Sequence, residues 1–209
     1  MITVTRTTKE SQICVSLDPA GLTEDYKKDL ETPSAMLSHM LEHLSYRSGM
    51  GLKVSCEYDG FPLAHVLFED LGITVGRAFG RLSERQVKDG CYGYGDAVGM
   101  IDEAFVQAAV SFESRALFLL EDAAVSMPAD CEDAKSEDLE TFLDGFCQGA
   151  HCTLQVEVRR GKNAHHIWEA VYRAVGSALE RALTSSPARA GKTSGVAGQI
   201  QWEISEDGK

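Results

Sequence analysis

The spacing of apolar and polar positions predicts a series of secondary-structure elements in the first part of the chain. Residues 2–6, 11–17 and 51–57 alternate apolar and polar positions, as β-strands do. Apolar residues recur at helical spacing over 34–47 and over 66–84. The first part therefore predicts the order strand, strand, helix, strand, helix.

The second part of the chain predicts the same order. Residues 104–121 favour two strands, although their alanines leave a helix open. Residues 136–149 predict a helix, 152–159 a strand, and 165–184 a strongly amphipathic helix.

The end of the chain has a different character. Residues 184–198 are rich in Ser, Gly and Ala, which predicts a loop. Residues 199–204 predict a last strand.

An internal repeat accounts for the recurrence of the pattern. Residues 64–69, AHVLFE, stand one hundred positions before residues 164–169, AHHIWE, and Gly76 stands one hundred before Gly176. Weaker matches at nearby offsets join residues 52–54 to 154–156 and residues 9–11 to 112–114. Several matches in the same order indicate a duplicated sequence.

The repeat sets the expected organisation of the chain. We expect a first half over 1–88, a second half over 89–185 and a C-terminal loop and strand over 186–209, all forming one compact unit. Strand pairs separated by helices indicate an α+β fold of two β-β-α-β-α halves.

Charge and cysteine content narrow the class of protein. The 209 residues carry a formal net charge of −12, which argues against a nucleic-acid or anionic-membrane surface. None of the six cysteines forms a C-x-x-C pair, and the N-terminus has no apolar signal core. We expect a cytoplasmic protein with free thiols and small-molecule or protein partners.

The sequence His165-His166-x-x-Glu169 is the main chemical signal. On a helix, His165 and Glu169 are four residues apart and share a face. If this motif stood alone, a solvated helix start would explain it better than a metal site. The repeat places His65 and Glu69 at the equivalent positions of the first half. Paired imidazole and carboxylate groups predict two related sites for Mn, Fe, Zn or Ni.

A third histidine cluster reads His39-Met40-Leu41-Glu42-His43. It matches the H-x-x-E-H pattern of one metalloprotease class, but nothing else in the chain supports a protease. We expect His39 alone to be functional, with Glu42 and His43 on the solvent side.

These residues resemble the imidazoleglycerol-phosphate dehydratase family over roughly residues 3–185. The stretches that carry the resemblance are residues 9–11, 36–41, 64–70, 102–104, 114–115 and 161–170. The resemblance implies a duplicated fold with helices packed between sheets (ribosomal protein S5 domain 2-like). It also implies a large, hollow homo-oligomer in which active sites form where subunits meet.

The resemblance further implies up to two Mn²⁺ ions, or another divalent transition metal, in each site. The ligands implied by position combine imidazoles and carboxylates: His65, His165 and Glu169 for one ion, and His39, His166 and Glu69 for the other. Val66 and Gln155 replace two family histidines, and only the amide oxygen of Gln155 could still act as a weak ligand. Three ligands and a water can still make a catalytic site.

Other differences from the family concern the substrate. Ser38 replaces an aspartate, Arg47 a histidine and Gly93 a phosphate-binding arginine, and the family's phosphate loop is not recognisable in the tail. Arg115 and Arg173 remain as anion binders, and we count Arg47 with them as a substrate-binding candidate.

The resemblance implies a dehydratase that removes water from the glycerol side chain of an imidazole, with a carboxylate moving protons. Glu10, Glu69 and Glu169 are the catalytic candidates and are not ranked. The replaced residues favour an altered azole or sugar-derived substrate, which need not be phosphorylated. The alternatives are a non-catalytic paralogue that keeps the scaffold and assembly, and a metal-binding storage or scaffold protein.

Overall fold

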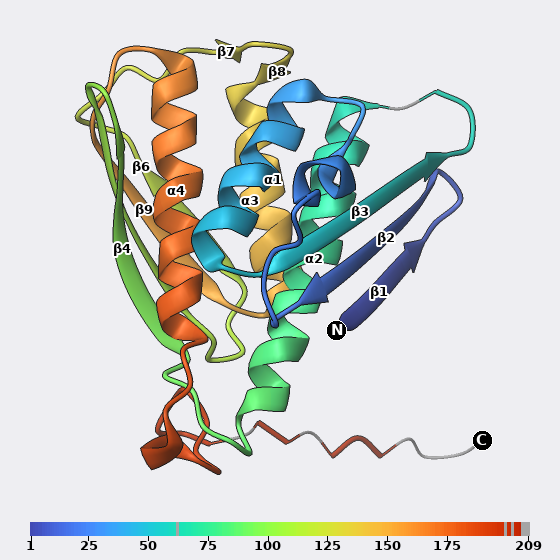
Figure 1. Ribbon diagram of the computed structural model, residues 1–209, viewed down its shortest axis with the longest axis vertical. Helices are drawn as coiled ribbons and strands as arrows, with labels where there is room; N and C mark the ends of the chain where they lie inside the picture. Colours follow the sequence, from blue (N-terminus) through green and yellow to red (C-terminus); the bar gives the residue numbers. More distant parts are fainter. Residues whose placement is uncertain (62, 199, 202, 206–209) are drawn as a thin grey trace.

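The computed structural model describes residues 1–61, 63–198, 200–201 and 203–205, and its helices lie between two β-sheets (Figure 1). The helices are α1 (Ala35–Ser48), α2 (Ala64–Gln86), α3 (Ser136–Ala150) and α4 (Ala164–Ala182), with 3-10 helices η1 (Tyr26–Leu30) and η2 (Pro187–Arg189). The strands are β1 (Ile2–Thr7), β2 (Ser11–Asp18), β3 (Gly51–Tyr58), β4 (Tyr94–Ile101), β5 (Ala104–Ser111), β6 (Leu117–Glu121), β7 (Asp130–Cys131), β8 (Ala134–Lys135) and β9 (Thr153–Arg160). The predicted α+β class is confirmed.

The two sheets differ in size. One has the antiparallel order β1-β2-β3, and the other has the order β4-β5-β9-β6, in which β6 runs parallel to β9. A separate short hairpin, β7–β8, lies at the end of the molecule where the helices begin, at the top of Figure 1. Compared with the first half, the second half therefore has an additional strand, β6, and this hairpin before α3.

The duplication is visible in how the helices pair. The short helix of each half packs against the long helix of the other, α3 on α2 and α1 on α4. The matched glycines lie at these contacts: a Cβ on Gly76 would lie 2.0 Å from the Phe146 carbonyl oxygen, and one on Gly176 would lie 2.7 Å from Cβ of Arg47. The repeat seen in the sequence thus corresponds to equivalent helix contacts.

The two helix pairs are not equally close. Gly72 and Gly76 of α2, with Gly145 and Gly149 of α3, bring those two backbones into direct contact. In α4 the position one hundred after Gly72 is Tyr172, which is fully buried. Nearer the start of α4, side chains rather than glycines lie between α1 and α4, and the candidate site is found there.

Strand β4 was not predicted from the sequence, because Gly95 and Gly99 interrupt its pattern. A Cβ on Gly95 would lie 2.1 Å from the Ala178 carbonyl oxygen, and one on Gly99 would lie 2.0 Å from that of Ala170. The two glycines let α4 pack directly on the strand. Residues 104–121 do form two strands, β5 and β6, so the open helix alternative is wrong.

One match of the predicted internal repeat is wrong. Glu10 lies in the turn between β1 and β2, and the equivalent turn between β4 and β5 holds Glu103. The match of residues 9–11 to 112–114 is therefore wrong in register.

In the predicted last strand, Gln199 and Trp202 lie outside the described residues, and the residues described around them carry no strand.

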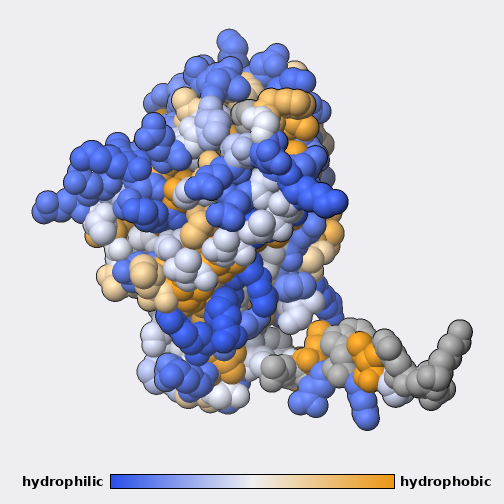
Figure 2. All heavy atoms as spheres, turned by 90° about the vertical axis from the view of Figure 1, so that its right-hand side faces the viewer, coloured by the Kyte–Doolittle hydropathy of each residue, from blue (hydrophilic) through white to orange (hydrophobic). Residues whose placement is uncertain are grey.

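The cysteines, the helices and the C-terminal segment each bear on an expectation about the environment of the chain. All six cysteines are free thiols, as expected. Within the described ranges, no helix has the length and apolarity that a membrane crossing needs. Figure 2 shows hydrophobic side chains on the C-terminal segment, where Ile200 is 51% and Ile204 83% exposed.

Candidate metal centre

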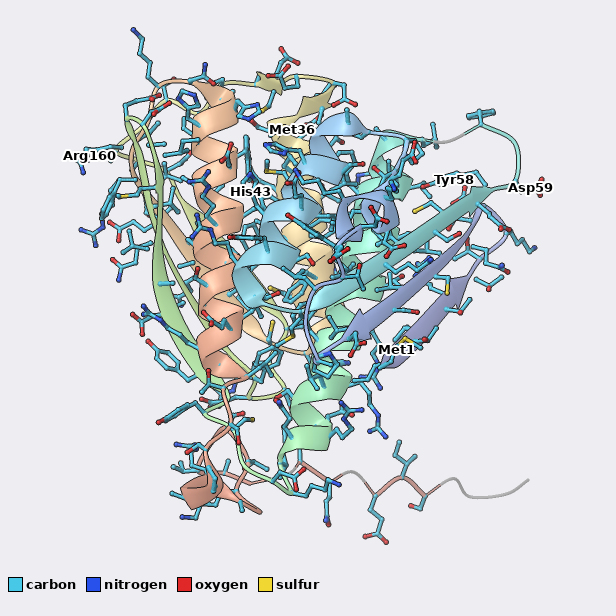
Figure 3. The ribbon with its side chains drawn as sticks, viewed as in Figure 1. Met1, Met36, His43, Tyr58, Asp59 and Arg160 are labelled. Carbon is cyan, nitrogen blue, oxygen red and sulfur yellow. The ribbon has the colours of Figure 1, made fainter. Side chains whose placement is uncertain are left out.

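Two helices each present a pair of side chains to the space between them. His39 and His43 are four residues apart on α1, and His165 and Glu169 are four apart on α4, so each pair shares one helix face. Asn163 caps α4 by accepting a hydrogen bond from the backbone N–H of His165 at 2.8 Å, which fixes the start of that helix. Figure 3 shows His43 between the two helices.

The three histidines surround the carboxylate of Glu169. The Nε2 atoms of His165 and His39 lie 3.2 and 3.5 Å from its Oε2, and Nε2 of His43 lies 3.1 Å from its Oε1. Donor atoms of His39, His165 and Glu169 all lie within 4.8 Å of one another. Divalent transition-metal ions such as Mn²⁺, Fe²⁺ or Zn²⁺ bind such mixed sets of imidazole and carboxylate ligands.

None of the three approaches to Glu169 has the geometry of a hydrogen bond within the part of the chain that is described. Charge-assisted hydrogen bonds are usually about 2.7–2.9 Å long. The three distances to Glu169 are longer than this, although those of His43 and His165 still lie within reach of an ordinary N–H···O hydrogen bond. The buried Nε2 of His43 nevertheless has no hydrogen-bond partner among the described residues. An unsatisfied buried nitrogen that faces a carboxylate fits a site for a cation.

Burial and nearby charge determine the protonation of the cluster. Burial lowers the pKa of His43 to about 4, so this imidazole is neutral at pH 7. Burial would raise the pKa of Glu169, but the charge that His43 carries when it is protonated and the permanent charge of Arg173 hold the pKa of this carboxyl below its ordinary value. At neutral pH the cluster therefore combines an ionised carboxylate with a neutral imidazole, the forms that bind metals.

Arg173 already pairs with Glu169. Its Nη2 atom contacts Oε1 of the carboxylate, and its Nη1 donates to the carbonyl oxygen of Met100 at 3.0 Å. The guanidinium therefore supplies positive charge on the same side of the carboxylate as His43.

A second carboxylate faces the outer nitrogen of each histidine on α4. Oε1 of Glu132 lies 3.2 Å from Nδ1 of His165, and Oε2 of Glu103 lies 2.8 Å from Nδ1 of His166. A carboxylate on Nδ1 favours the tautomer whose Nε2 is free to bind a metal. The Glu103 hydrogen bond raises the pKa of His166, while the backbone N–H of Asn163 and the His166 ring lower the pKa of Glu103 to about 2.

A cavity of about 600 Å³ opens beside His39. Its lining includes Lys27 and Lys28 of η1, Ser38 and Glu42 of α1, and Asp133 of the β7–β8 turn. This is space enough for a small molecule next to the candidate metal ligands.

The comparisons with known proteins identify the family of the chain. A profile of the imidazoleglycerol-phosphate dehydratase family matches residues 32–179. The chain belongs to this family. Imidazoleglycerol-phosphate dehydratases of Helicobacter hepaticus and Deinococcus radiodurans are 32% and 35% identical to it over 189 and 181 residues. These alignments cover 90% and 86% of this chain, and 91% and 90% of the relatives.

Solved structures extend the likeness to the fold. A crystal structure of the Pyrococcus furiosus dehydratase in complex with (S)-C348 superposes with a TM-score of 0.76 at 28% identity, covering 94% of this chain and all of that one. A Staphylococcus aureus imidazoleglycerol-phosphate dehydratase, at 23% identity and a TM-score of 0.69, shows the same fold.

In this member of the dehydratase family, the other duplicated pair does not join the cluster within one chain. Nε2 of His65 lies 3.6 Å from Oε2 of Glu69, but their side chains are 68% and 39% exposed. Gln155 points out of the sheet, because its neighbours Leu154 and Val156 are the buried ones. The predicted ligand sets of the family thus need residues from other copies, and they stay predictions.

The remaining predicted residues lie at the periphery of the chain. Glu10 is exposed in the β1–β2 turn, Arg115 is exposed before β6, and Arg47 is exposed near the end of α1. Across the described ranges, none of the three hydrogen-bonds or ion-pairs with the cluster.

The prediction that His43 lies on the solvent side is wrong. The His43 side chain is only 15% exposed and faces Glu169. Glu42 is 22% exposed and pairs with Lys27 at 2.6 Å. The four-residue spacing of His39 and His43 indicated that both side chains share one face of a helix. The sequence did not show that this face packs against the helix that carries Glu169.

Proposed function

We propose that this chain is a metal-dependent carbon–oxygen lyase that removes water from the polyol side chain of an azole. Its relatives are named imidazoleglycerol-phosphate dehydratases, so the substrate is expected to be that compound or a close analogue. The single observation that carries the proposal is the convergence of His39, His165 and Glu169 between α1 and α4.

The residues of the chain have distinct parts in this proposal. His39, His165 and Glu169 would hold a divalent ion such as Mn²⁺, which supplies Lewis-acid stabilisation of negative charge when it is bound. The cavity beside His39 would receive the substrate. Glu10, Glu69 and Glu169 remain the candidates for moving protons, and a group in this role must lie within hydrogen-bonding reach of the substrate.

Both predicted ligand sets require assembly of several copies, because each includes residues that lie away from the cluster in the single chain. His65, Glu69 and Gln155 all face solvent in the single chain, although the resemblance makes them ligands. The outer face of the β4-β5-β9-β6 sheet, which carries Gln155, also exposes apolar side chains: Val98 (50%), Met100 (64%) and Leu119 (48%). Exposed apolar patches of this kind commonly mark protein interfaces. We therefore propose a homo-oligomer that completes the sites.

The site also supports an altered substrate. Ser38 hydrogen-bonds with Thr32 and Ser34, so it does not orient the His39 ring. Lys27 and Lys28 bring positive charge to the cavity, beside Glu42 and Asp133. The anion-binding groups of this site therefore differ from the pattern that the family resemblance implies.

One observation favours the non-catalytic alternative. The Arg173 guanidinium contacts Glu169 and supplies the charge that a cation would supply. Together with Val66 and Gln155, this contact fits a paralogue that keeps the fold without the metal chemistry.

Metal analysis and turnover assays distinguish these functions. The full chain would be loaded with Mn²⁺, passed through a desalting column and assayed with imidazoleglycerol phosphate and with its dephosphorylated form. We expect stoichiometric metal and turnover that Glu169→Gln abolishes. Fewer than about 0.2 ions per chain would contradict the metal site. Metal without turnover of either compound would favour the storage or scaffold alternative.

A further inference from the structure

One end of the β1-β2-β3 sheet carries polar side chains on the face that packs against α2. In the middle of this face the side chains are apolar and buried, as for Val15 and Val54. Near the β1–β2 turn, Arg6, Ser11 and Tyr58 take the inner positions of the three strands. Figure 3 shows Tyr58 at the end of β3. This end of the sheet therefore faces α2 with polar groups that need a partner.

Asp70 of α2 is the partner of two of these side chains. Its side chain is only 7% exposed, and Nη1 of Arg6 lies 2.7 Å from its Oδ2. The hydroxyl of Ser11 donates to the same oxygen at 2.5 Å. Burying a carboxylate is costly unless it is paired and hydrogen-bonded, so these contacts hold the three side chains together. Asp70 therefore ties both β1 and β2 to the helix.

The contact continues into the backbone of Glu10. The hydroxyl of Thr8 accepts hydrogen bonds from the backbone N–H groups of Glu10 and Ser11 at 3.1 and 3.0 Å, which closes the turn. The backbone N–H of Asp59 donates to the carbonyl oxygen of Glu10 at 3.0 Å. Glu10 is thus held on both sides, next to the residue that bonds to Asp70.

The helix end of the contact lies next to Glu69. Asp70 points to the inner side of α2, whereas Glu69 and His65, four residues apart, share an outer face with Nε2 and Oε2 3.6 Å apart. The Ser11–Asp70 hydrogen bond therefore has a proton-transfer candidate beside each of its ends, Glu10 in the turn and Glu69 on the helix.

We propose that Asp70 is a positioning residue, which holds the turn of Glu10 against α2 so that Glu10, His65 and Glu69 form one half-site. The proposal rests on the proposed function, because Glu10 and Glu69 are its candidates for moving protons. A buried ion pair adds little stability compared with apolar side chains of the same volume. Its hydrogen-bond geometry, however, fixes how the joined elements lie, and reacting groups need such placement.

Substitutions of Ser11 break the link without removing the charge of Asp70. Ser11→Ala removes the hydroxyl. Ser11→Thr and Ser11→Val form a matched pair, because threonine and valine have nearly the same shape and differ in the hydroxyl. Ser16→Ala is the control, since Ser16 lies on the same strand and hydrogen-bonds with Thr3 instead. Circular dichroism would check that each variant keeps its helices, and a Ser11→Ala variant that unfolds leaves the decision to the matched pair.

Amide hydrogen exchange, followed by NMR in the metal-free full-length protein, measures how firmly the turn is held. We expect the amides of Glu10 and Asp59 to exchange at least about tenfold faster in Ser11→Ala and Ser11→Val than in the wild type. Ser11→Thr and Ser16→Ala should match the wild type, and the amide of Val15 in the middle of β2 should be unchanged in every variant. Equal exchange in Ser11→Thr and Ser11→Val would overturn the proposal.

Turnover separates positioning from a contact that only supports the fold. With the Mn²⁺-loaded protein and imidazoleglycerol phosphate, we expect kcat of Ser11→Val to be at least about tenfold below that of Ser11→Thr. KM should stay similar, because displaced reacting groups slow the chemical step without removing substrate contacts. Faster exchange with an unchanged kcat would refute the positioning role.

The outcome is separable from that of the proposed function. A wild-type protein that turns over neither imidazoleglycerol phosphate nor its dephosphorylated form refutes the lyase. The exchange rates then decide alone whether Asp70 holds the turn. An active wild type whose kcat is the same in Ser11→Thr and Ser11→Val refutes only the role of Asp70.

Discussion

Oε2 of Glu103 lies 2.8 Å from Nδ1 of His166 and so joins the β4–β5 turn to the first turn of α4. The other oxygen of Glu103 accepts hydrogen bonds from the backbone N–H groups of Lys162 and Asn163 at 3.1 and 2.8 Å. One carboxylate therefore fixes the entry to the helix and the orientation of one of its histidines.

Replacing Glu103 by glutamine should lower the pKa of His166. In the metal-free protein the Glu103 hydrogen bond holds this pKa above its ordinary value. The pair therefore stabilises the fold below pH of about 6.5, and this contribution is lost as pH rises through the raised pKa. NMR titration of the histidine ring measures the shift. Asp102→Asn should change it less, because Asp102 contributes only through its charge at longer range. An unchanged pKa in Glu103→Gln would contradict this account.

Removing the Asp133 carboxylate should destabilise the chain. Asp133 accepts hydrogen bonds from the backbone N–H groups of Ala35 and Met36 at 2.7 and 2.8 Å, and so caps α1 from the β7–β8 turn. Because the residue is exposed, we expect Asp133→Ala to lower the free energy of unfolding by about 0.5–1 kcal/mol. Urea denaturation at pH 7 measures this, with the exposed Asp130→Ala as the control.

The same variant has a predictable pH dependence. Burial alone would raise the pKa of Asp133, but the bonds from Met36 and Ala35 outweigh it and hold the pKa below its ordinary value. The stabilisation is therefore complete above pH of about 4 and is lost as pH falls through the lowered pKa. A difference from the wild type that grows below pH 4 would argue against the cap.

Adding a methyl group at Gly76 should separate α2 from α3. The new Cβ would lie 2.0 Å from the carbonyl oxygen of Phe146, so one of the helices must move. We expect Gly76→Ala to lower the free energy of unfolding by about 1–3 kcal/mol. Chemical denaturation should show this loss, whereas Arg81→Ala, on the exposed side of α2, should change stability little.

Arg173 should weaken cation binding, because its guanidinium contacts Glu169. Removing this charge in Arg173→Gln should raise the affinity for Mn²⁺ severalfold, while Arg173→Lys should stay near the wild type. Calorimetric titration with Mn²⁺ compares the three proteins. Weaker binding by Arg173→Gln would mean that the arginine helps to organise the site.

The sequence predicted the helices well, because their apolar faces are continuous. It missed β4 because the two glycines that let α4 approach the strand also remove its alternating pattern. The predicted strand pair at 104–121 was found, but its distant partners could not be read from local spacing. Parallel pairing of β6 with β9 depends on tertiary contacts alone.

The candidate site was predicted in part. The repeated motif drew attention to His165 and Glu169, and the histidine cluster at residues 39–43 added His39. His43 was dismissed because a helix sequence does not show which face will meet a neighbour. Only the position of α4 against α1 makes the His39–His43 face the inner one.

The unequal closeness of the two helix pairs has an evolutionary consequence. Where α2 packs against α3, glycines bring the two backbones into direct contact, so larger side chains there would push the helices apart. This contact therefore tolerates few substitutions and maintains the arrangement of the helices. Where α1 meets α4, Gly176 brings the backbones close at one point, and polar side chains fill the contact nearer the start of α4. Polar groups can therefore be exchanged at that end of the contact while the α2–α3 pair keeps the helices in place.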